Sequence, residues 1–338
     1  MNKFSMFATA TLLTVGSLTS SVFAADYNLK FAHFWPSSSG VHTGFETWAE
    51  SLEKASDGRI SVEFYPAQTL AKAPKSYDAV KNRIADITAT VQGYSANRFP
   101  LTQVVELPGV ASSAAQGSCV IQSLYDESLI SKEYDDTHVL FLFTHGPGDF
   151  HTKDKAIETP ADLAGLKVRR PTTVVAEMLE GLGAQPVGMP APNTYPSLQR
   201  GVIDGVAMPW EAMKSFRLNE LATFHTELGL YTLSFVVTMN KDIYNSMPDD
   251  LKAVVDTHSG MDWAQKQALV FDDLDTLGRE EAVNAGHSII TLEGGVNNPA
   301  WKPVLETATN NYLGALEDKG MPARKVYDRA MELSKTCL

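Results

Sequence analysis

Hydrophobic and polar residues alternate over several short segments, and amphipathic stretches lie between these segments. Alternation predicts strands, and the helical spacing of Phe45, Trp48 and Leu52 predicts a helix whose apolar face packs on a sheet. In the first part of the chain we expect, in order, strand 28–33, helix 42–55, strand 60–65, helix 76–82 and strand 84–91. This order implies a parallel sheet with helices on its faces.

The same alternation continues to the end of the chain and predicts an α/β fold. Further strands are expected at 138–144, 166–169, 185–188, 206–208, 235–240 and 288–292, and helices at 173–182 and 194–200. Two long segments, 249–284 and 300–334, are mostly helical in pattern. At 338 residues the chain is long for one hydrophobic core, which favours two lobes, and we expect strand 235–240 to return to the first.

Residues 1–24 have the pattern of a secretory signal peptide. Lys3 precedes an apolar run over residues 4–18, and the segment ends in Val22-Phe23-Ala24, with small or permissive side chains where signal peptidase reads. A transmembrane anchor is the alternative, but the run is shorter than the ~20 residues that span a bilayer. We therefore expect cleavage after Ala24 and export of the rest of the chain.

The charge and cysteine content limit which classes of partner and which covalent links the protein can have. The net charge of −12 argues against nucleic acid. It does not exclude an anionic ligand, because one arginine in a cleft outweighs distant, screened charges. The two cysteines, Cys119 and Cys337, allow one disulfide in an oxidising compartment, and two unpaired thiols are the alternative because sequence gives no distance.

The sequence lacks the common motifs of catalysis. It contains no G-x-S-x-G, H-E-x-x-H, C-x-x-C or P-loop motif, and its eight histidines form no cluster with metal-ligand spacing. We therefore expect no catalytic residue, no metal and no cofactor. A binding protein is favoured over an enzyme.

Several short motifs in a fixed order carry a family resemblance. They are F-Y-P-A-Q-T-L at 64–70, G-L-K-V-R-R-P at 165–171, L-G-A-Q-P-V at 182–187 and Y-P-S-L-Q-R-G-V-I-D-G at 195–205. Together they resemble the solute-binding proteins of tripartite ATP-independent periplasmic (TRAP) transporters, the DctP-like family. The resemblance covers nearly the whole chain after the signal segment.

The resemblance implies a periplasmic, two-lobed α/β binding protein that closes on a ligand and delivers it to integral-membrane permease subunits. Lobe I would comprise 25–145 plus about 236–275, and lobe II 146–235 plus about 276–338. The segment 249–284 resembles the family's lobe-spanning helix. We expect a monomer that contacts its permease transiently. A sensory protein that reports ligand to a membrane partner is an alternative with the same fold.

Arg169 is the main candidate for ligand binding. It ends a predicted buried strand two residues before Pro171, and ligands of open α/β sheets bind beyond the carboxyl ends of strands. A guanidinium is a rigid fork that matches a carboxylate. A surface arginine paired with an acid is the alternative, but the position matches the family's carboxylate-binding arginine. Arg170, next along the strand, should point the other way.

Three departures from the family pattern limit the range of ligands that the protein could bind. Asp149 stands about where sialic-acid-binding members have a second arginine. The sequence Ala207-Met208-Pro209 stands where many members have Glu-Asn-Pro. Many members also have a glutamate two residues before Tyr195; here Asn193 stands in its place, and we have no explanation for this change. One arginine and a soft apolar contact predict a small organic acid, a compact monocarboxylate, aromatic or 2-oxo.

The other cleft candidates all lie at or near strand ends. They are His33, Phe34, Trp35, Tyr94, His145, Asp149, Met208, Trp210 and Glu211. Each residue also has an alternative role to ligand contact. The aromatic residues could pack in the core, the histidines could make structural hydrogen bonds, and Glu211 could cap a helix or bind a cation. A zwitterionic or cationic ligand, caged by Trp35 and Trp210 with Asp149 or Glu211, is the alternative to a simple acid.

Overall fold

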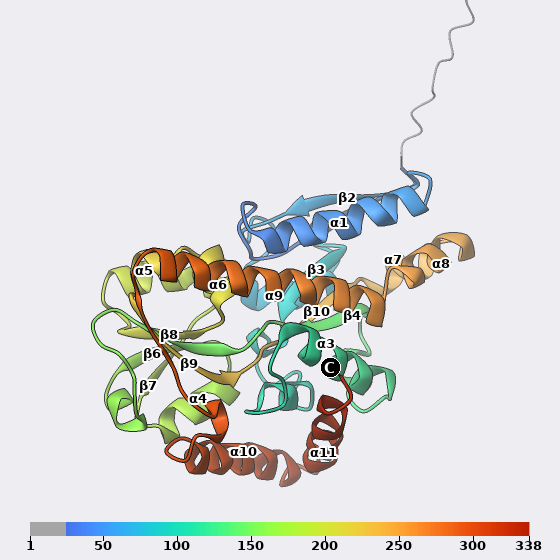
Figure 1. Ribbon diagram of the computed structural model, residues 1–338. Coiled ribbons are helices and arrows are strands. Elements are labelled where there is room, and N and C mark those ends of the chain that lie inside the picture. Colours follow the sequence, from blue (N-terminus) through green and yellow to red (C-terminus); the bar gives the residue numbers. More distant parts are fainter. Residues whose placement is uncertain (1–24, 338) are drawn as a thin grey trace, which may run out of the picture.

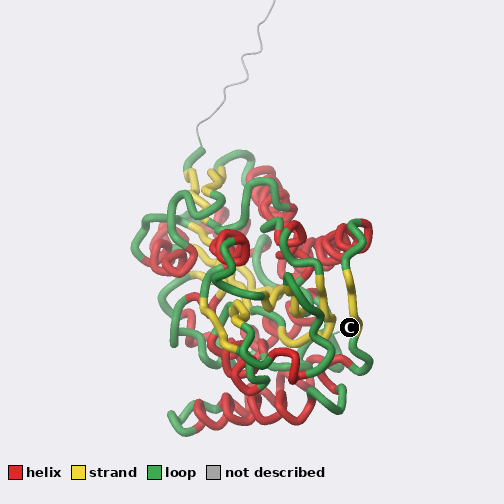
Figure 2. The backbone as a smooth tube through the Cα atoms, turned by 90° about the vertical axis from the view of Figure 1, so that its left-hand side faces the viewer, coloured by secondary structure: helices red, strands yellow, loops and turns green. Residues whose placement is uncertain are grey.

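The computed structural model describes residues 25–337, so the predicted signal peptide lies outside the described residues. Two β-sheets with helices packed on them form two lobes, which crossing segments and one long helix connect (Figure 1). Figure 2 shows the strands in the interior and most helices at the periphery. The predicted two-lobed α/β fold is confirmed.

The first lobe contains a five-stranded sheet in the order β2-β1-β3-β10-β4. Its strands are β1 (Tyr27–Ala32), β2 (Ile60–Tyr65), β3 (Ile87–Val91), β4 (His138–Thr144) and β10 (Ser234–Met239). β1 is parallel to β2 and β3, as the strand–helix order predicts, whereas β10 runs antiparallel between β3 and β4. The expected return of the later strand to the first sheet is therefore confirmed.

Helices pack on this sheet because they have apolar faces that are buried against it. In α1, Phe45, Trp48 and Leu52 are buried as their spacing predicts, and the Ser39 hydroxyl caps the helix by accepting a hydrogen bond from the Val41 N–H at 3.2 Å. The helices of this lobe are α1 (Gly40–Ala55), α2 (Ser76–Lys81), α3 (Ala114–Asp126), α7 (Lys241–Ser246) and α8 (Asp249–Thr257).

The second lobe contains a six-stranded sheet in the order β11-β9-β5-β8-β6-β7. Its strands are β5 (Gly148–Thr152), β6 (Lys167–Arg170), β7 (Gln185–Gly188), β8 (Gly205–Met208), β9 (Phe224–Tyr231) and β11 (Ser288–Thr291), and its shorter helices are α4 (Thr173–Gly181), α5 (Thr194–Gln199) and α6 (Trp210–Ser215). Sequence reasoning missed β5 and β9. Both run antiparallel to each other and carry the chain between the lobes.

The long helical segment is divided in two. Gly260 has a φ of 73°, and its N–H donates to the Leu140 carbonyl, so α8 ends and α9 (Met261–Asn284) starts there. α9 packs on α1 and α3 of the first lobe and on α6 of the second (Figure 1). Within residues 25–337, no helix combines the length and apolar composition needed to cross a bilayer.

The end of the chain returns to the first lobe. After α10 (Lys302–Glu317), Gly320 and Pro322 interrupt the helical pattern, and α11 (Ala323–Ser334) packs against α3. Cys337 forms a disulfide with Cys119 of α3, with the two Cα atoms 5.7 Å apart. The disulfide and the packing of α11 therefore tie the end of the chain to α3.

The disulfide should stabilise the fold, because it closes a loop of 218 residues and so restricts the unfolded chain. Replacing both cysteines by serine should lower the free energy of unfolding by about 2–5 kcal/mol, measured by urea unfolding. A reducing agent should destabilise the wild-type protein and leave the serine variant unchanged. Identical wild-type midpoints with and without reductant would contradict the prediction.

Candidate ligand-binding site

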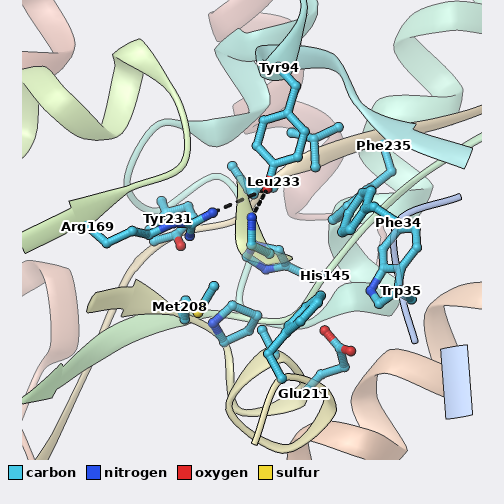
Figure 3. Close-up of a pocket in the computed structure, with 15 residues that line it drawn as sticks. Phe34, Trp35, Tyr94, His145, Arg169, Met208, Glu211, Tyr231, Leu233 and Phe235 are labelled. Atoms are coloured by element: carbon cyan, nitrogen blue, oxygen red, sulfur yellow. Dashed lines mark hydrogen bonds between the residues drawn. The ribbon is translucent and has the colours of Figure 1, made fainter. Parts of the chain in front are cut away.

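A cavity lies between the two lobes, beyond the strand ends where the sequence predicted a cleft. The space in and around it amounts to about 310 Å³, part of which is open to solvent. The residues that line it are Phe34, Trp35, Val91, Tyr94, His145, Arg169, Ala191, Met208, Pro209, Glu211, Ala212, Phe216, Tyr231, Leu233 and Phe235 (Figure 3). The lining is therefore mostly aromatic and aliphatic, with a few polar groups.

Arg169 ends β6 and lies in this cavity with only 1% of its surface exposed. Its guanidinium donates to the Met189 carbonyl at 3.1 Å, the Ala207 carbonyl at 3.2 Å and the Tyr94 hydroxyl at 3.2 Å. All three acceptors are uncharged, and no salt bridge links Arg169 to an acid among residues 25–337. Of its five N–H groups, these bonds leave two without a protein partner.

Tyr94 connects the lobes. It follows β3 in the short helix η2 (Gln92–Tyr94) of the first lobe, and its hydroxyl accepts hydrogen bonds from Arg169 and, at 2.9 Å, from the Ala191 N–H of the second lobe. Burial raises the pKa of Tyr94, so the phenol stays protonated. Because the oxygen accepts twice, its own hydrogen is available to an anion in the cavity (Figure 3).

His145 contributes an acceptor to the cavity wall. It follows β4, and its Nδ1 lies beside the Gly146 carbonyl, to which it donates. Burial lowers the pKa of His145 to about 3, so the ring is neutral and its Nε2 carries a lone pair. That Nε2 is buried and lacks a hydrogen-bond partner in the described part of the chain. The histidine is therefore oriented before any ligand arrives.

Glu211 is the one carboxyl group that lines the cavity. It lies in the first turn of α6 and is 2% exposed, and burial raises its pKa to about 7. Ser215 donates a hydrogen bond to its Oε1, and the Ser215 hydroxyl lies 2.8 Å from that of Ser39 in the first lobe. The Glu211 backbone N–H donates to Asp275 of α9, which fixes the start of α6.

An aromatic wall closes the cavity opposite Arg169 (Figure 3). Phe34 stacks on Trp35 with ring centroids 3.9 Å apart, and Phe235 lies 5.5 Å from Trp35. Sequence reasoning missed Phe216, Tyr231, Leu233 and Phe235 as lining residues. The apolar residues at alternate positions just before and into the predicted strand 235–240 were the available signal.

Three sequence candidates lie outside the cavity. His33 is buried in the first lobe, where its Nε2 lies 2.9 Å from His42. Trp210 turns away and donates from its ring N–H to Glu227 at 3.0 Å. Asp149 accepts hydrogen bonds at 2.8 Å from two consecutive backbone N–H groups of β9. The remaining candidates, Phe34, Trp35, Tyr94, His145, Arg169, Met208 and Glu211, line the cavity together.

Among the described residues, no group of three or more histidine, cysteine or acidic side chains is arranged to hold a metal ion. The aromatic and acidic cage expected around a cation is also not assembled in this cavity, because Trp210 and Asp149 face elsewhere. The cavity instead combines one buried cation, one buried carboxyl group and aromatic walls.

Two α/β lobes that enclose a small cavity define a solute-binding protein. The chain belongs to family 7 of the bacterial extracellular solute-binding proteins, the DctP family, whose sequence profile matches residues 31–312. The predicted identity as a DctP-like TRAP solute-binding protein is confirmed. The family and the similar proteins below are binding proteins rather than enzymes, and the family implies a periplasmic location.

Two solved TRAP solute-binding proteins are especially similar. One, from an unidentified microbe of a marine metagenome, is specific for aromatic acids and holds 3-hydroxybenzoate; it is 38% identical, with a TM-score of 0.89 over 93% of this chain and 99% of that one. Another, from Rhodoferax ferrireducens, holds copurified benzoate; it is 37% identical, with a TM-score of 0.88 over 92% and 98%. A solute-binding protein of Roseobacter denitrificans is 29% identical over 63% of this chain and 66% of its own length.

The buried Asp149 gives a testable pH dependence. Burial raises its pKa from 3.8 to about 7, so between these values the folded protein keeps a proton that the unfolded chain has lost. Raising the pH therefore favours unfolding, and the stability that this proton linkage provides is lost as the pH approaches 7. The difference in unfolding free energy, wild type minus Asp149→Asn, should fall by about 1–3 kcal/mol between about pH 4.5 and 7.

Urea unfolding at a series of pH values measures this difference, and the histidines cancel because both proteins contain them. The exposed Asp154→Asn is the control for loss of one negative charge. A wild-type minus Asp149→Asn difference that rises with pH would show that this carboxyl group is ionised in the folded protein over that range.

Proposed function

We infer that this protein captures a small aromatic monocarboxylate between its lobes and that Arg169 binds the carboxylate. The observation that carries the inference is the buried guanidinium, which has neutral partners and two N–H groups left over. Burying a charge without a counter-ion is costly, and a carboxylate supplies the missing charge through two parallel hydrogen bonds. The Tyr94 hydroxyl adds a third donor to the same place.

The walls support an aromatic ligand. Phe34, Trp35 and Phe235 offer flat apolar surfaces, and rings prefer to stack or meet edge to face with other rings. Sugar-sized polyols with many hydroxyl groups would find too few hydrogen-bond partners in this mostly apolar lining. The two similar proteins that hold benzoate and 3-hydroxybenzoate favour the same ligand class.

The transport role follows from the family. A TRAP solute-binding protein gives its ligand to integral-membrane permease subunits, and the expected signal peptide would place this chain in the periplasm with them. Lobe closure around Tyr94 and Arg169 would mark the loaded form for the permease. We expect a monomer that contacts the permease only transiently.

Substitution of Arg169 tests the grip on the carboxylate. Arg169→Ala should weaken benzoate binding by about 100-fold or more, because two charge-assisted hydrogen bonds are lost. Arg169→Lys keeps the charge without the fork and should lose about tenfold or more. Isothermal titration of ligand-free protein measures both. Arg170→Lys is the matched control, since its guanidinium lies beside Gly188 rather than in the cavity.

Thermal unfolding without ligand checks that each variant is folded. If folded Arg169→Lys and Arg169→Ala bind benzoate as tightly as Arg170→Lys does, the assignment of Arg169 is wrong. If the wild-type protein binds no aromatic acid but binds another carboxylate through Arg169, the ligand class is wrong and the role of the arginine stands.

Tyr94→Phe tests the link between the lobes. The change removes one donor to the carboxylate and leaves the Ala191 N–H and one Arg169 N–H unpaired in the closed form. We expect benzoate affinity to fall by about 10- to 100-fold. The control is Tyr195→Phe, whose hydroxyl bonds to the exposed Glu220. Equal affinities of the two phenylalanine variants would contradict a role for Tyr94 in binding.

A further inference from the structure

The cavity has a second polar position besides Arg169, and it is Glu211. The side chain is 98% buried and lines the cavity, but only its Oε1 receives a hydrogen bond, from Ser215. Its Oε2 has no hydrogen-bond partner among residues 25–337, and this oxygen is not among the fully buried side-chain atoms. Figure 3 shows the carboxyl group below Trp35, on another side of the cavity from Arg169 and Tyr94.

A hydrogen-bond chain orients this carboxyl group. Ser215 uses its only hydrogen on Glu211, so the Ser39 hydroxyl must donate in turn to Ser215 across 2.8 Å. Ser39 itself accepts from the Val41 N–H at the start of α1. The donors in this chain therefore point toward Oε1, so Oε2 is the oxygen that remains for a ligand.

The surroundings exclude a protein cation as the missing partner. Cavity residues near Glu211, such as Phe34, Trp35, Ala212 and Phe216, are apolar. Lys214 of α6 is bonded to Glu281 and Arg279 of α9 to Glu227, so neither cation pairs with Glu211. Asp275 of α9 accepts a hydrogen bond from the Glu211 N–H. Because Glu211 lines the cavity and its Oε2 has no hydrogen-bond partner among residues 25–337, this oxygen is available to accept a hydrogen bond from a ligand.

We propose that Glu211 determines specificity by accepting a hydrogen bond from a hydroxyl group on the ring of the bound aromatic acid. The inference rests on the proposed function and deepens it: the preferred ligand class is hydroxylated aromatic monocarboxylates. Arg169 and Tyr94 bind the carboxylate, the aromatic wall holds the ring, and Glu211 binds the hydroxyl group. Neutral phenols donate well and carry no charge to desolvate, which suits an apolar cavity.

Matched ligands separate this hydrogen bond from simple filling of space. The probes are benzoate, the three isomers of hydroxybenzoate and the corresponding methylbenzoates, titrated by calorimetry. The wild-type protein should bind at least one hydroxybenzoate about 10- to 100-fold more tightly than the methyl analogue with the same substitution position. The isomer that shows the preference locates Oε2 relative to the carboxylate site.

Glu211→Met keeps the length of the side chain and removes both oxygens. It should abolish the hydroxyl preference, measured as the ratio of hydroxybenzoate affinity to methylbenzoate affinity within the same variant. Glu211→Gln should keep part of the preference because an amide oxygen can still accept, and it remains informative if the methionine variant does not fold. Glu280→Met, an exposed change on α9, should leave the preference intact.

The inference is overturned if the wild-type protein prefers no hydroxybenzoate over its methyl analogue, or if Glu211→Met retains the preference. It is also overturned if 3-(aminomethyl)benzoate binds more tightly than every hydroxybenzoate, because Glu211 would then bind a cation. In each case benzoate binding that depends on Arg169 leaves the proposed function standing. Absence of binding to every benzoate derivative would overturn both.

Discussion

The buried charge of Arg169 is the constraint on which the ligand site depends. A guanidinium at 1% exposure without an acidic partner is costly, and three neutral oxygens offset only part of that cost. Two of them are backbone carbonyls of the second lobe, at Met189 and Ala207, so the strand ends around β6 and β8 fix the arginine. The third is the Tyr94 hydroxyl of the first lobe. The guanidinium therefore makes all three hydrogen bonds only when the lobes are closed. Its charge is neutralised only if a bound ligand supplies an anion.

The polarity of the cavity lining changes with distance from that charge. Next to the guanidinium lies His145, kept neutral by burial, and then an aromatic wall with little hydrogen-bonding capacity. At another side lies Glu211, whose raised pKa of about 7 reflects the same absence of water. The ligand that we propose follows this order of groups: it is acidic at one point, flat and apolar in the middle, and polar again at its edge. The Ser39–Ser215 contact connects this last position to the first lobe.

Much of this arrangement could be predicted from the sequence, and the failures have physical reasons. The strand end and following proline located Arg169, and the same rule located Trp35, Tyr94, His145 and Met208. His33, Asp149 and Trp210 follow the same rule but do not line this cavity, because the end of a strand gives the place of a residue and not the rotation of its side chain. Tyr231, Leu233 and Phe235 were missed since no motif marks the segment that crosses between lobes.

The long helix shows the same limit. Its amphipathic pattern runs without interruption from 249 to 284, and a break at residues 258–260, where Gly260 has a positive φ, separates α8 from α9. Within α9, Asp272 accepts from the N–H groups of Ala114 and Ala115 at the start of α3, and Asp275 accepts from Glu211 at the start of α6. One helix thus holds the starts of two others, one in each lobe. Side-chain to backbone contacts of this kind leave no periodic signal in a sequence.

The enclosure of the cavity has a kinetic consequence. Its lining residues belong to both lobes, and Tyr94 bonds to Arg169 and Ala191 across the boundary, so a ligand between the lobes would contact both of them. The dissociation rate then depends on how often the lobes separate as well as on the ligand's own contacts. A membrane partner that held the lobes apart would accelerate release without touching the ligand.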